Sequence, residues 1–475
     1  MANAQTSAHS LPVTLGALRA SGWQSIPVKE ELRRNAVARI SAGQQLFDGV
    51  LGYEDTVMPQ LENALLAGHD VIFLGERGQA KTRMIRSLTG LLDEWMPIIE
   101  GSEINDDPYN PVSRHARELV EKMGDNAPIS WVNREDRYGE KLATPDTSIA
   151  DLIGEVDPIK VAEGRYLSDE LTIHYGLVPR TNRGIFAINE LPDLAERIQV
   201  GLLNVLEERD VQIRGYKIRL PLDVMLVASA NPEDYTNRGR MITPLKDRFG
   251  SQIRTHYPLE VATEMHIVRQ EARTSSIGDV VVQWPEFMEE IISTISHTAR
   301  ASTHVSQRSG VSVRLSVSNY ETLAANAVRR ALRVGETQVS PRVSDLVALA
   351  ASTAGKIEIE SMEEGRESII LENIVKASVL QVFKQRVTSE KIRDVLAAFD
   401  EGVVAHAGED VSSSDYVGLF ANVPALRDLV GLLVPADASQ ATQASAVEFV
   451  LEGLHLSKRL NKDSSGARST YRSRT

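Results

Sequence analysis

One glycine-containing turn limits the possible folds of this chain more than any other segment. The turn is GERGQAKT, residues 75–82. The apolar run DVIFL precedes it, and apolar residues recur at helical spacing after Lys81 as far as Trp95. Glycine lets the backbone turn tightly, so that successive N–H groups and a helix N-terminus converge on one point. This strand–turn–helix context is typical of a phosphate-binding loop, and it predicts an α/β fold with a mainly parallel sheet.

The residue types in the turn suit a nucleotide carried with Mg²⁺. Lys81 can reach terminal phosphates, and Thr82 offers a hydroxyl to the metal. Ala80 replaces the second glycine of the strict motif, and an alanine there is tolerable if the position has helix-like dihedrals, because only a positive φ strictly penalises a Cβ. An ordinary glycine turn is the alternative. The prediction is a site for ATP and Mg²⁺ formed by Gly75, Glu76, Arg77, Gly78, Gln79, Ala80, Lys81 and Thr82.

A second polar feature ends the apolar run GIFAIN, residues 184–189. Glu190 follows it, and a carboxylate there can orient and deprotonate an attacking water. Asn189 occupies the position where nucleotide hydrolases commonly have an aspartate that holds Mg²⁺ through its water shell. An amide oxygen can accept a hydrogen bond from a metal-bound water but adds no charge, so we expect weaker Mg²⁺ binding. A buried strand that ends in a polar turn is the alternative.

The hydrophobic pattern divides the chain into regions of different character. Residues 45–257 alternate short apolar runs with amphipathic helices. Helical patterns dominate after Pro258, and HAGEDVSSSDY at 406–416 is typical of a linker or exposed loop. Within the α/β region we expect strands at 70–75, 128–133, 184–189 and 223–231. The predicted regions are an N-terminal extension at 1–44, a nucleotide-binding domain at 45–257, a helical lid at 258–390, a C-terminal helical segment at 391–460 and a disordered tail at 461–475.

Composition excludes several classes of function. The chain has 52 Lys plus Arg against 65 Asp plus Glu, a formal charge of -13, which argues against a protein built to grip phosphate backbones. The absence of cysteine removes thiol chemistry and favours a cytoplasmic location. No apolar run approaches the ~18 residues of a membrane helix, and no histidine cluster suggests zinc.

Four further segments accompany the phosphate loop in a fixed order. With it they resemble the AAA+ module of the magnesium chelatase ATPase subunit, within the wider MoxR-like group. The likeness covers about residues 45–257, is weaker in the helical region and is not evident after about residue 390. The four segments are GEVDPIKVAEG (154–164), GLVPRTNRGIFAINE (176–190), IRGYKIRLPLDVMLVASANPEDY (213–235) and LKDRFG (245–250).

The resemblance implies roles for three more residues. Asn231 is similar to the sensor that contacts the γ-phosphate or the attacking water. Arg248 resembles the arginine finger that reaches a neighbouring subunit's nucleotide, a task suited to a fixed charge with a donor fork. Arg314 resembles the second sensor arginine at the start of a lid helix, with Arg308 close by. A surface ion pair with Asp247 and a solvated helix-end arginine are the alternatives for Arg248 and Arg314.

Two segments of this group are expected to project from a ring. One is the hairpin indicated by alternating apolar residues in VQIRGYKIRLP, residues 211–221, and the other is an insertion within residues 155–180. Passive packing is the alternative for the hairpin.

The resemblance also implies an activity and an assembly. The expected protein is a ring-forming ATPase, a hexamer of identical subunits, that drives a partner with a von Willebrand A or integrin-I domain, and tetrapyrrole chemistry belongs to other subunits. The implied catalytic set is Lys81, Glu190, Asn231 and Arg248, with Thr82 and Asn189 at the metal.

Two other functions remain open at this stage. A nucleotide-dependent scaffold that does not hydrolyse ATP is the second hypothesis, with Asn189 as the sign of lost turnover. A nucleic-acid motor is the third, disfavoured by the acidic balance and by the absence of a GAFTGA loop or an evident helix-turn-helix.

Overall fold

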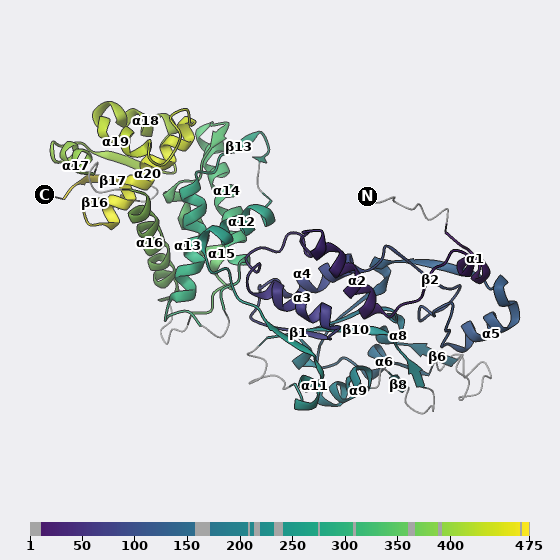
Figure 1. Ribbon diagram of the computed structural model, residues 1–475. Coiled ribbons are helices and arrows are strands. Elements are labelled where there is room, and N and C mark those ends of the chain that lie inside the picture. Colours follow the sequence, from purple (N-terminus) through teal and green to yellow (C-terminus); the bar gives the residue numbers. More distant parts are fainter. Residues whose placement is uncertain are drawn as a thin grey trace. The chain divides into compact units, whose positions relative to one another are not determined.

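The computed structural model describes residues 11–156, 172–207, 210–212, 219–231, 241–273, 276–306, 310–359, 366–387, 392–465 and 468–474. The chain forms two compact units (Figure 1). The first comprises Met1–Glu76 and Ala80–His256, and the second Arg77–Gln79 and Tyr257–Thr475.

A five-stranded parallel sheet forms the centre of the first unit. Its order in space is β11-β1-β10-β7-β4. The strand that comes first in the sequence, β1, therefore lies between the two that come last, β10 and β11. Three central strands are buried along their whole length, as expected for a parallel sheet covered on both faces. The bounds are β1 Val71–Leu74, β4 Tyr138–Leu142, β7 Gly184–Asn189, β10 Val224–Ala230 and β11 Ser251–Arg254.

Helices cover both faces of this sheet (Figure 1). Along β7, Ile185 and Ala187 face one hydrophobic core, while Phe186 and Ile188 face the other. On the first face lie α2 (Val28–Ser41), α3 (Val57–Ala67) and α4 (Lys81–Ser87). On the second lie α6 (Ile149–Leu152), α8 (Leu177–Arg180), α9 (Glu196–Glu207) and α11 (Thr243–Arg248).

Three of the four expected strands are confirmed as β1, β7 and β10 of this sheet. The fourth, β3 (Ile129–Asn133), is a strand, but it pairs antiparallel with β2 (Trp95–Ile99) outside the sheet. The strands β4 and β11 were not predicted, because their sequences YGEKL and SQIR are polar. Both are edge strands, which do not need a continuous apolar run because they are only partly covered.

The expected helix from Lys81 to Trp95 was wrong in its length. α4 ends at Ser87, a 3-10 turn follows at Leu88–Leu91, and Trp95 opens β2. The helical spacing continued past the true end because Leu88 and Leu91 pack into the same core as α4.

Smaller elements complete the first unit. The arms of the expected hairpin pair antiparallel as β8 (Asp210–Gln212) and β9 (Arg219–Pro221), and residues 213–218 lie outside the described part. In the predicted insertion, β5 (Gly154–Val156) pairs with β6 (Ile173–Tyr175), and residues 157–171 are not described. Among the described residues of this unit, the remaining α-helices are α1 (Leu15–Ala20) and α5 (Arg114–Met123).

The second unit is mainly helical and has one large core. Phe287 and Phe449 stack at its centre with ring centroids 4.6 Å apart. Its helices are α12 (Val261–Glu271), α13 (Glu286–Ala301), α14 (Arg314–Val334), α15 (Leu349–Thr353), α16 (Arg366–Arg386), α17 (Ile392–Asp400), α18 (Ser413–Asn422), α19 (Pro424–Val430) and α20 (Gln440–Leu456).

Two small sheets accompany these helices. One contains β12 (Ser276–Ile277), β13 (Val280–Val282) and β14 (Gln338–Val339), and the other contains β15 (Ala405–Gly408), β16 (Leu460–Ser465) and β17 (Arg468–Ser473). Among the described residues, no helix combines the length and the hydropathy needed to span a membrane.

Two expectations for the C-terminal part were wrong. The segment at 461–475 was expected to be disordered, but β16 and β17 form a hairpin anchored by Tyr471, which is 1% exposed and donates its hydroxyl to Glu452. The segment at 406–416 was expected to be a linker or an exposed loop, but most of β15 is buried and a capping box at Ser412 starts α18. In both segments, a few buried side chains hold the backbone in regular structure, although the polar composition around them is typical of a loop or a disordered tail.

Candidate active site

The predicted phosphate loop follows β1 at the carboxyl end of the sheet. The N–H of Gly75 donates to the carbonyl of Ala230 at 3.1 Å, which ties the start of the loop to β10. α4 begins at Lys81, and its first backbone bond runs from the N–H of Met84 to the carbonyl of Ala80 at 3.0 Å. A helix N-terminus therefore opens at the carboxyl edge of a parallel sheet, where α/β proteins bind their ligands.

Ala80 does not have the helix-like dihedrals under which an alanine is tolerated without strain. Its φ of 54° and ψ of 14° are left-handed. The alanine keeps the backbone conformation that a glycine would adopt freely, at a cost of roughly 1–2 kcal/mol. The loop geometry thus persists despite the departure from the strict motif.

Lys81 and Thr82 begin α4 directly after this strained residue. Lys81 is 7% exposed, and its ammonium donates to the carbonyls of Gly75 and Glu76, the latter at 2.7 Å. Thr82 is partly buried at the second position of the helix. An ammonium, a hydroxyl and backbone N–H groups form a donor set that suits the phosphates of a nucleotide.

Three predicted residues come together at the same edge. The register pairs Leu74 of β1 with Ala230 of β10, and Ala228 of β10 with Ile188 of β7. The three strands therefore end side by side, so the loop after β1, Asn231 after β10 and Asn189 at the end of β7 lie at the same edge. Glu190 follows with a φ of 54°, and its N–H donates to the Ser229 hydroxyl at 3.2 Å. The structure thus places the loop, Asn189, Glu190 and Asn231 around one edge of the sheet.

The Asn189 amide is held at both ends. Its Nδ2 donates to Oε1 of Glu140 at 2.5 Å, and its Oδ1 accepts from the Ser229 hydroxyl at 3.1 Å. Glu140 also accepts from Nε of Arg86 at 2.8 Å. Glu140 was not predicted as a site residue, because it lies on β4, a polar strand without an apolar signal.

Charge and burial act on two neighbours of Glu140. The hydrogen bond to Glu140 raises the pKa of the Arg86 guanidinium above its ordinary value. Burial, with the negative charge of Glu140, raises the pKa of the Tyr138 hydroxyl, so this group stays neutral. Arg86 and Glu140 are therefore the charged members of this small network.

Neither predicted arginine lies at the carboxyl edge of the sheet: Arg248 is near its amino edge, and Arg314 belongs to the second unit. Arg248 ends α11 just before β11, which enters the sheet at Ser251 beside Val71, the amino end of β1. Its Nη1 donates to the carbonyl of Pro244 at 2.9 Å. Arg314 is the first residue of α14 in the second unit, and Arg308 lies outside the described residues. The roles of both arginines stay predictions.

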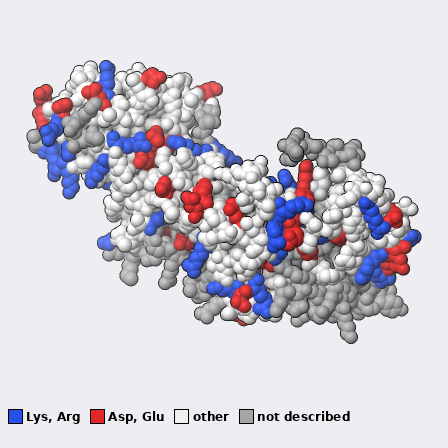
Figure 2. All heavy atoms as spheres, in the orientation of Figure 1, with Lys and Arg blue, Asp and Glu red and all other residues white. Residues whose placement is uncertain are grey.

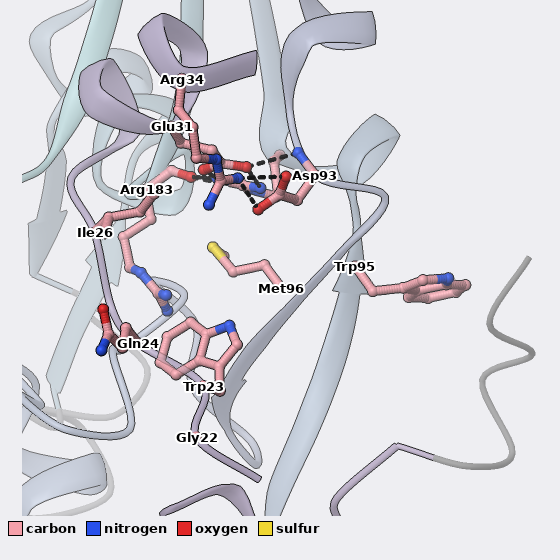
Figure 3. A pocket seen from close by; sticks show the side chains of 11 residues that line it. Gly22, Trp23, Gln24, Ile26, Glu31, Arg34, Asp93, Trp95, Met96 and Arg183 are labelled. Carbon is pink, nitrogen blue, oxygen red and sulfur yellow. Dashed lines mark hydrogen bonds and ion pairs between the residues drawn. The ribbon is translucent and has the colours of Figure 1, made fainter. Parts of the chain in front are cut away.

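A cavity of about 430 Å³ lies at the opposite, amino edge of the sheet (Figure 3). Arg137 and Arg183, which directly precede β4 and β7, contribute to its wall. Arg137 forms a buried bidentate pair with Glu31, at 2.8 and 2.6 Å. Because it lies across the sheet from the loop, this cavity is not the phosphate site.

The sequence comparisons agree with the geometry of the first unit. The family described as Sigma-54 interaction domain matches residues 163–249. Magnesium-chelatase subunit ChlI of Nostoc sp. is 29% identical over 231 residues, covering 47% of this chain and 58% of the relative. The magnesium-chelatase 38 kDa subunit of Rhodobacter capsulatus is 30% identical over 237 residues, covering 47% and 59%. The chain thus matches less than two thirds of the length of these relatives.

A solved complex between subunits BchI and BchD of magnesium chelatase contains a chain of 19% identity, with 69% of this chain and 97% of that chain covered. The TM-score of 0.34 is too low to transfer any feature.

The parallel sheet and the loop that follows β1 have the arrangement of an AAA+ P-loop nucleotide-binding module. Over about half of its length, the chain is similar in sequence to the magnesium-chelatase subunits.

Proposed function

We propose that the protein is a ring-forming AAA+ ATPase that couples binding and hydrolysis of Mg-ATP to the remodelling or activation of a partner protein. The observation that carries this proposal is the convergence of the phosphate loop, Asn189, Glu190 and Asn231 at one edge of the sheet. That edge combines donors for phosphate with a carboxylate for water, the two requirements of nucleotide hydrolysis.

Each residue has a defined task in this proposal. The loop N–H groups and Lys81 bind the phosphates, and the hydroxyl of Thr82 with the amide oxygen of Asn189 would hold the metal or its waters. Bound Mg²⁺ would supply charge neutralisation at the phosphates. Glu190 orients the attacking water and accepts its proton, while Asn231 contacts the terminal phosphate or that water.

Assembly follows from the proposed task of Arg248. Arg248 lies beside the amino end of β11, whereas the phosphate loop of the same chain lies at the carboxyl edge of the sheet. This placement favours a contact between Arg248 and the nucleotide of a neighbouring subunit. We therefore propose a hexameric homo-oligomer in the cytoplasm, with Arg314 as a further contact to nucleotide. Such a ring contains one active site at each subunit interface.

The partner is inferred from the relatives. Because the matching proteins are subunits of magnesium chelatase, we propose a chelatase-like motor that acts on a partner with a von Willebrand A or integrin-I domain, in metal insertion or in maturation of a complex. This chain needs no tetrapyrrole site of its own for that task.

The test is ATP hydrolysis by the wild type and by Glu190→Gln, at a protein concentration that permits assembly. We expect turnover in the wild type and a loss of at least about 100-fold in the variant, with ATP binding retained, because a general base contributes about that much. Equal hydrolysis by both proteins would remove Glu190 from its assigned task.

A second candidate is a nucleotide-dependent scaffold without turnover, and the neutral Asn189 favours it. This protein would bind ATP and assemble, yet neither the wild type nor the variant would hydrolyse ATP, even with its partner. A nucleic-acid motor is favoured less. On the face shown in Figure 2, basic side chains are interspersed with acidic ones, and the net charge is -13. Stimulation of ATPase activity by DNA would reverse that order.

A further inference from the structure

We propose that Glu140 is a positioning residue that orients the amide of Asn189, so that the Asn189 oxygen is presented to the Mg²⁺ of bound nucleotide. The Glu140–Asn189 pair then takes the place of the single aspartate that ends this strand in other nucleotide hydrolases. This inference rests on the proposed function, because it assigns a task within the same site.

The two side chains share one face of the sheet. The register of β4 and β7 pairs Glu140 with Ala187 and Leu142 with Asn189. Because side chains alternate along a strand, Asn189 lies on the same face as Ala187, the face covered by α4. Glu140 thus approaches Asn189 from the neighbouring strand, on the side where the phosphate loop leads into its helix.

The chemistry of the contact determines which end of the amide faces which neighbour. A carboxylate can only accept, so Glu140 binds the NH₂ end of Asn189, at 2.5 Å. The opposite end, Oδ1, accepts one bond from Ser229 at 3.1 Å. A carbonyl oxygen has two lone pairs, so Oδ1 keeps the capacity to accept from a metal-bound water.

Arg86 holds Glu140 in place from α4. Its Nε and Nη2 donate to the two carboxylate oxygens at 2.8 and 3.2 Å. Thr82 lies one turn earlier on the same side of this helix, at roughly 5–6 Å between Cβ atoms. The proposed metal ligand and the anchor of Glu140 are therefore carried by one rigid element.

The same contact accounts for the asparagine. An aspartate at position 189 would bring two carboxylates into direct contact, and one of them would have to leave or take up a proton. An amide removes this repulsion and turns the contact into a hydrogen bond to a charged acceptor, which is one of the stronger kinds. The residue that replaces the common aspartate thus fits its neighbour.

The test is a double-mutant cycle of Asn189→Asp, Glu140→Gln and the two changes together. The double variant reverses the contact, because the amide introduced on β4 can donate to the carboxylate introduced at the end of β7. The readouts are the equilibrium affinity for a fluorescent ATP analogue with and without Mg²⁺, and the electron paramagnetic resonance spectrum of Mn²⁺ bound with ATP. Neither measurement requires turnover.

We expect Asn189→Asp to lower the Mg²⁺-dependent part of the affinity by about tenfold, because the two carboxylates would repel each other and the metal contact would lose its orientation. Glu140→Gln should lower it less, because the glutamine oxygen can still accept from Asn189. The double variant should recover to within about threefold of the wild type, because the pair is complementary again. Affinity without metal should stay unchanged in all three, which also shows that the loop is folded. Glu118→Gln, an exposed change of the same charge on α5, is the matched control and should have no effect.

Single variants that bind Mg-ATP like the wild type, or a double variant no better than the worse single one, would contradict this inference alone. A wild type that binds no Mg-ATP would contradict the proposed function, and the inference would fail with it.

Discussion

Ala80 and Glu190, on either side of the candidate active site, both have a left-handed backbone although neither is glycine. Their φ values are both 54°. Such conformations cost energy and persist only where the surrounding structure imposes them, and they are concentrated at functional sites. At Ala80 the phosphate loop imposes the conformation, and at Glu190 the turn that follows β7 does so.

The strain at Ala80 can be measured by Ala80→Gly. Relief of the left-handed strain is worth roughly 1–2 kcal/mol, and the added freedom of glycine in the unfolded chain costs roughly 0.5–1 kcal/mol. We therefore expect the free energy of unfolding to rise by up to about 1.5 kcal/mol, with ATP affinity retained. Denaturant unfolding measures this change, and a loss of stability would show that Ala80 is not strained.

At the scale of single elements, α20 is held tightly by the rest of the second unit. It is buried on nearly all sides, and its two glutamates are satisfied by tyrosines. Glu448 accepts from Tyr416 at 2.6 Å, and Glu452 accepts from Tyr471. Burial raises the pKa of both tyrosine hydroxyls, which stay protonated and able to donate.

Close packing of α20 predicts the effect of Gly453→Ala. An added Cβ would lie 2.1 Å from Cδ2 of Phe383, so the aromatic ring or the helix must shift. We expect a loss of about 1–3 kcal/mol of stability, as overpacking of a core causes.

Gly418→Ala on α18 is the matched control, because nothing lies within 4 Å of the Cβ added there. Alanine should stabilise this helix by about 0.5–1 kcal/mol. Thermal unfolding of both variants makes the comparison, and equal effects would contradict the packing of α20 described above.

At the scale of the whole molecule, the proposed ring makes hydrolysis depend on two subunits. Arg248→Ala should bind ATP but not hydrolyse it, and so should Glu190→Gln. An equimolar mixture should recover about a quarter of the wild-type rate. An active interface needs one subunit with an intact Glu190 beside a neighbour with an intact Arg248, and each of these is present in about half of the positions of a randomly assembled ring.

Steady-state ATPase assays of the mixture test this directly. If Arg248 acted within its own subunit, the mixture would contain no intact site and would stay inactive. Native mass spectrometry of the same samples verifies that mixed rings form.

Local patterns were sufficient for the strand–loop–helix and for the three central strands. The runs at β1, β7 and β10 are buried on both faces, so their composition alone identifies them. Local patterns failed where a few long-range contacts dominate, as in the hairpin anchored by Tyr471 and in the polar edge strand that carries Glu140.

Hydrophobic period and residue type at short spacing were enough to establish the α/β class, the phosphate loop and the polar residues that end β7. Three features became known from the folded chain alone: β4 lies beside β7, Glu140 therefore meets Asn189, and Ala80 has a positive φ. Strand pairing and backbone strain arise from segments far apart in the chain, and no local pattern records them.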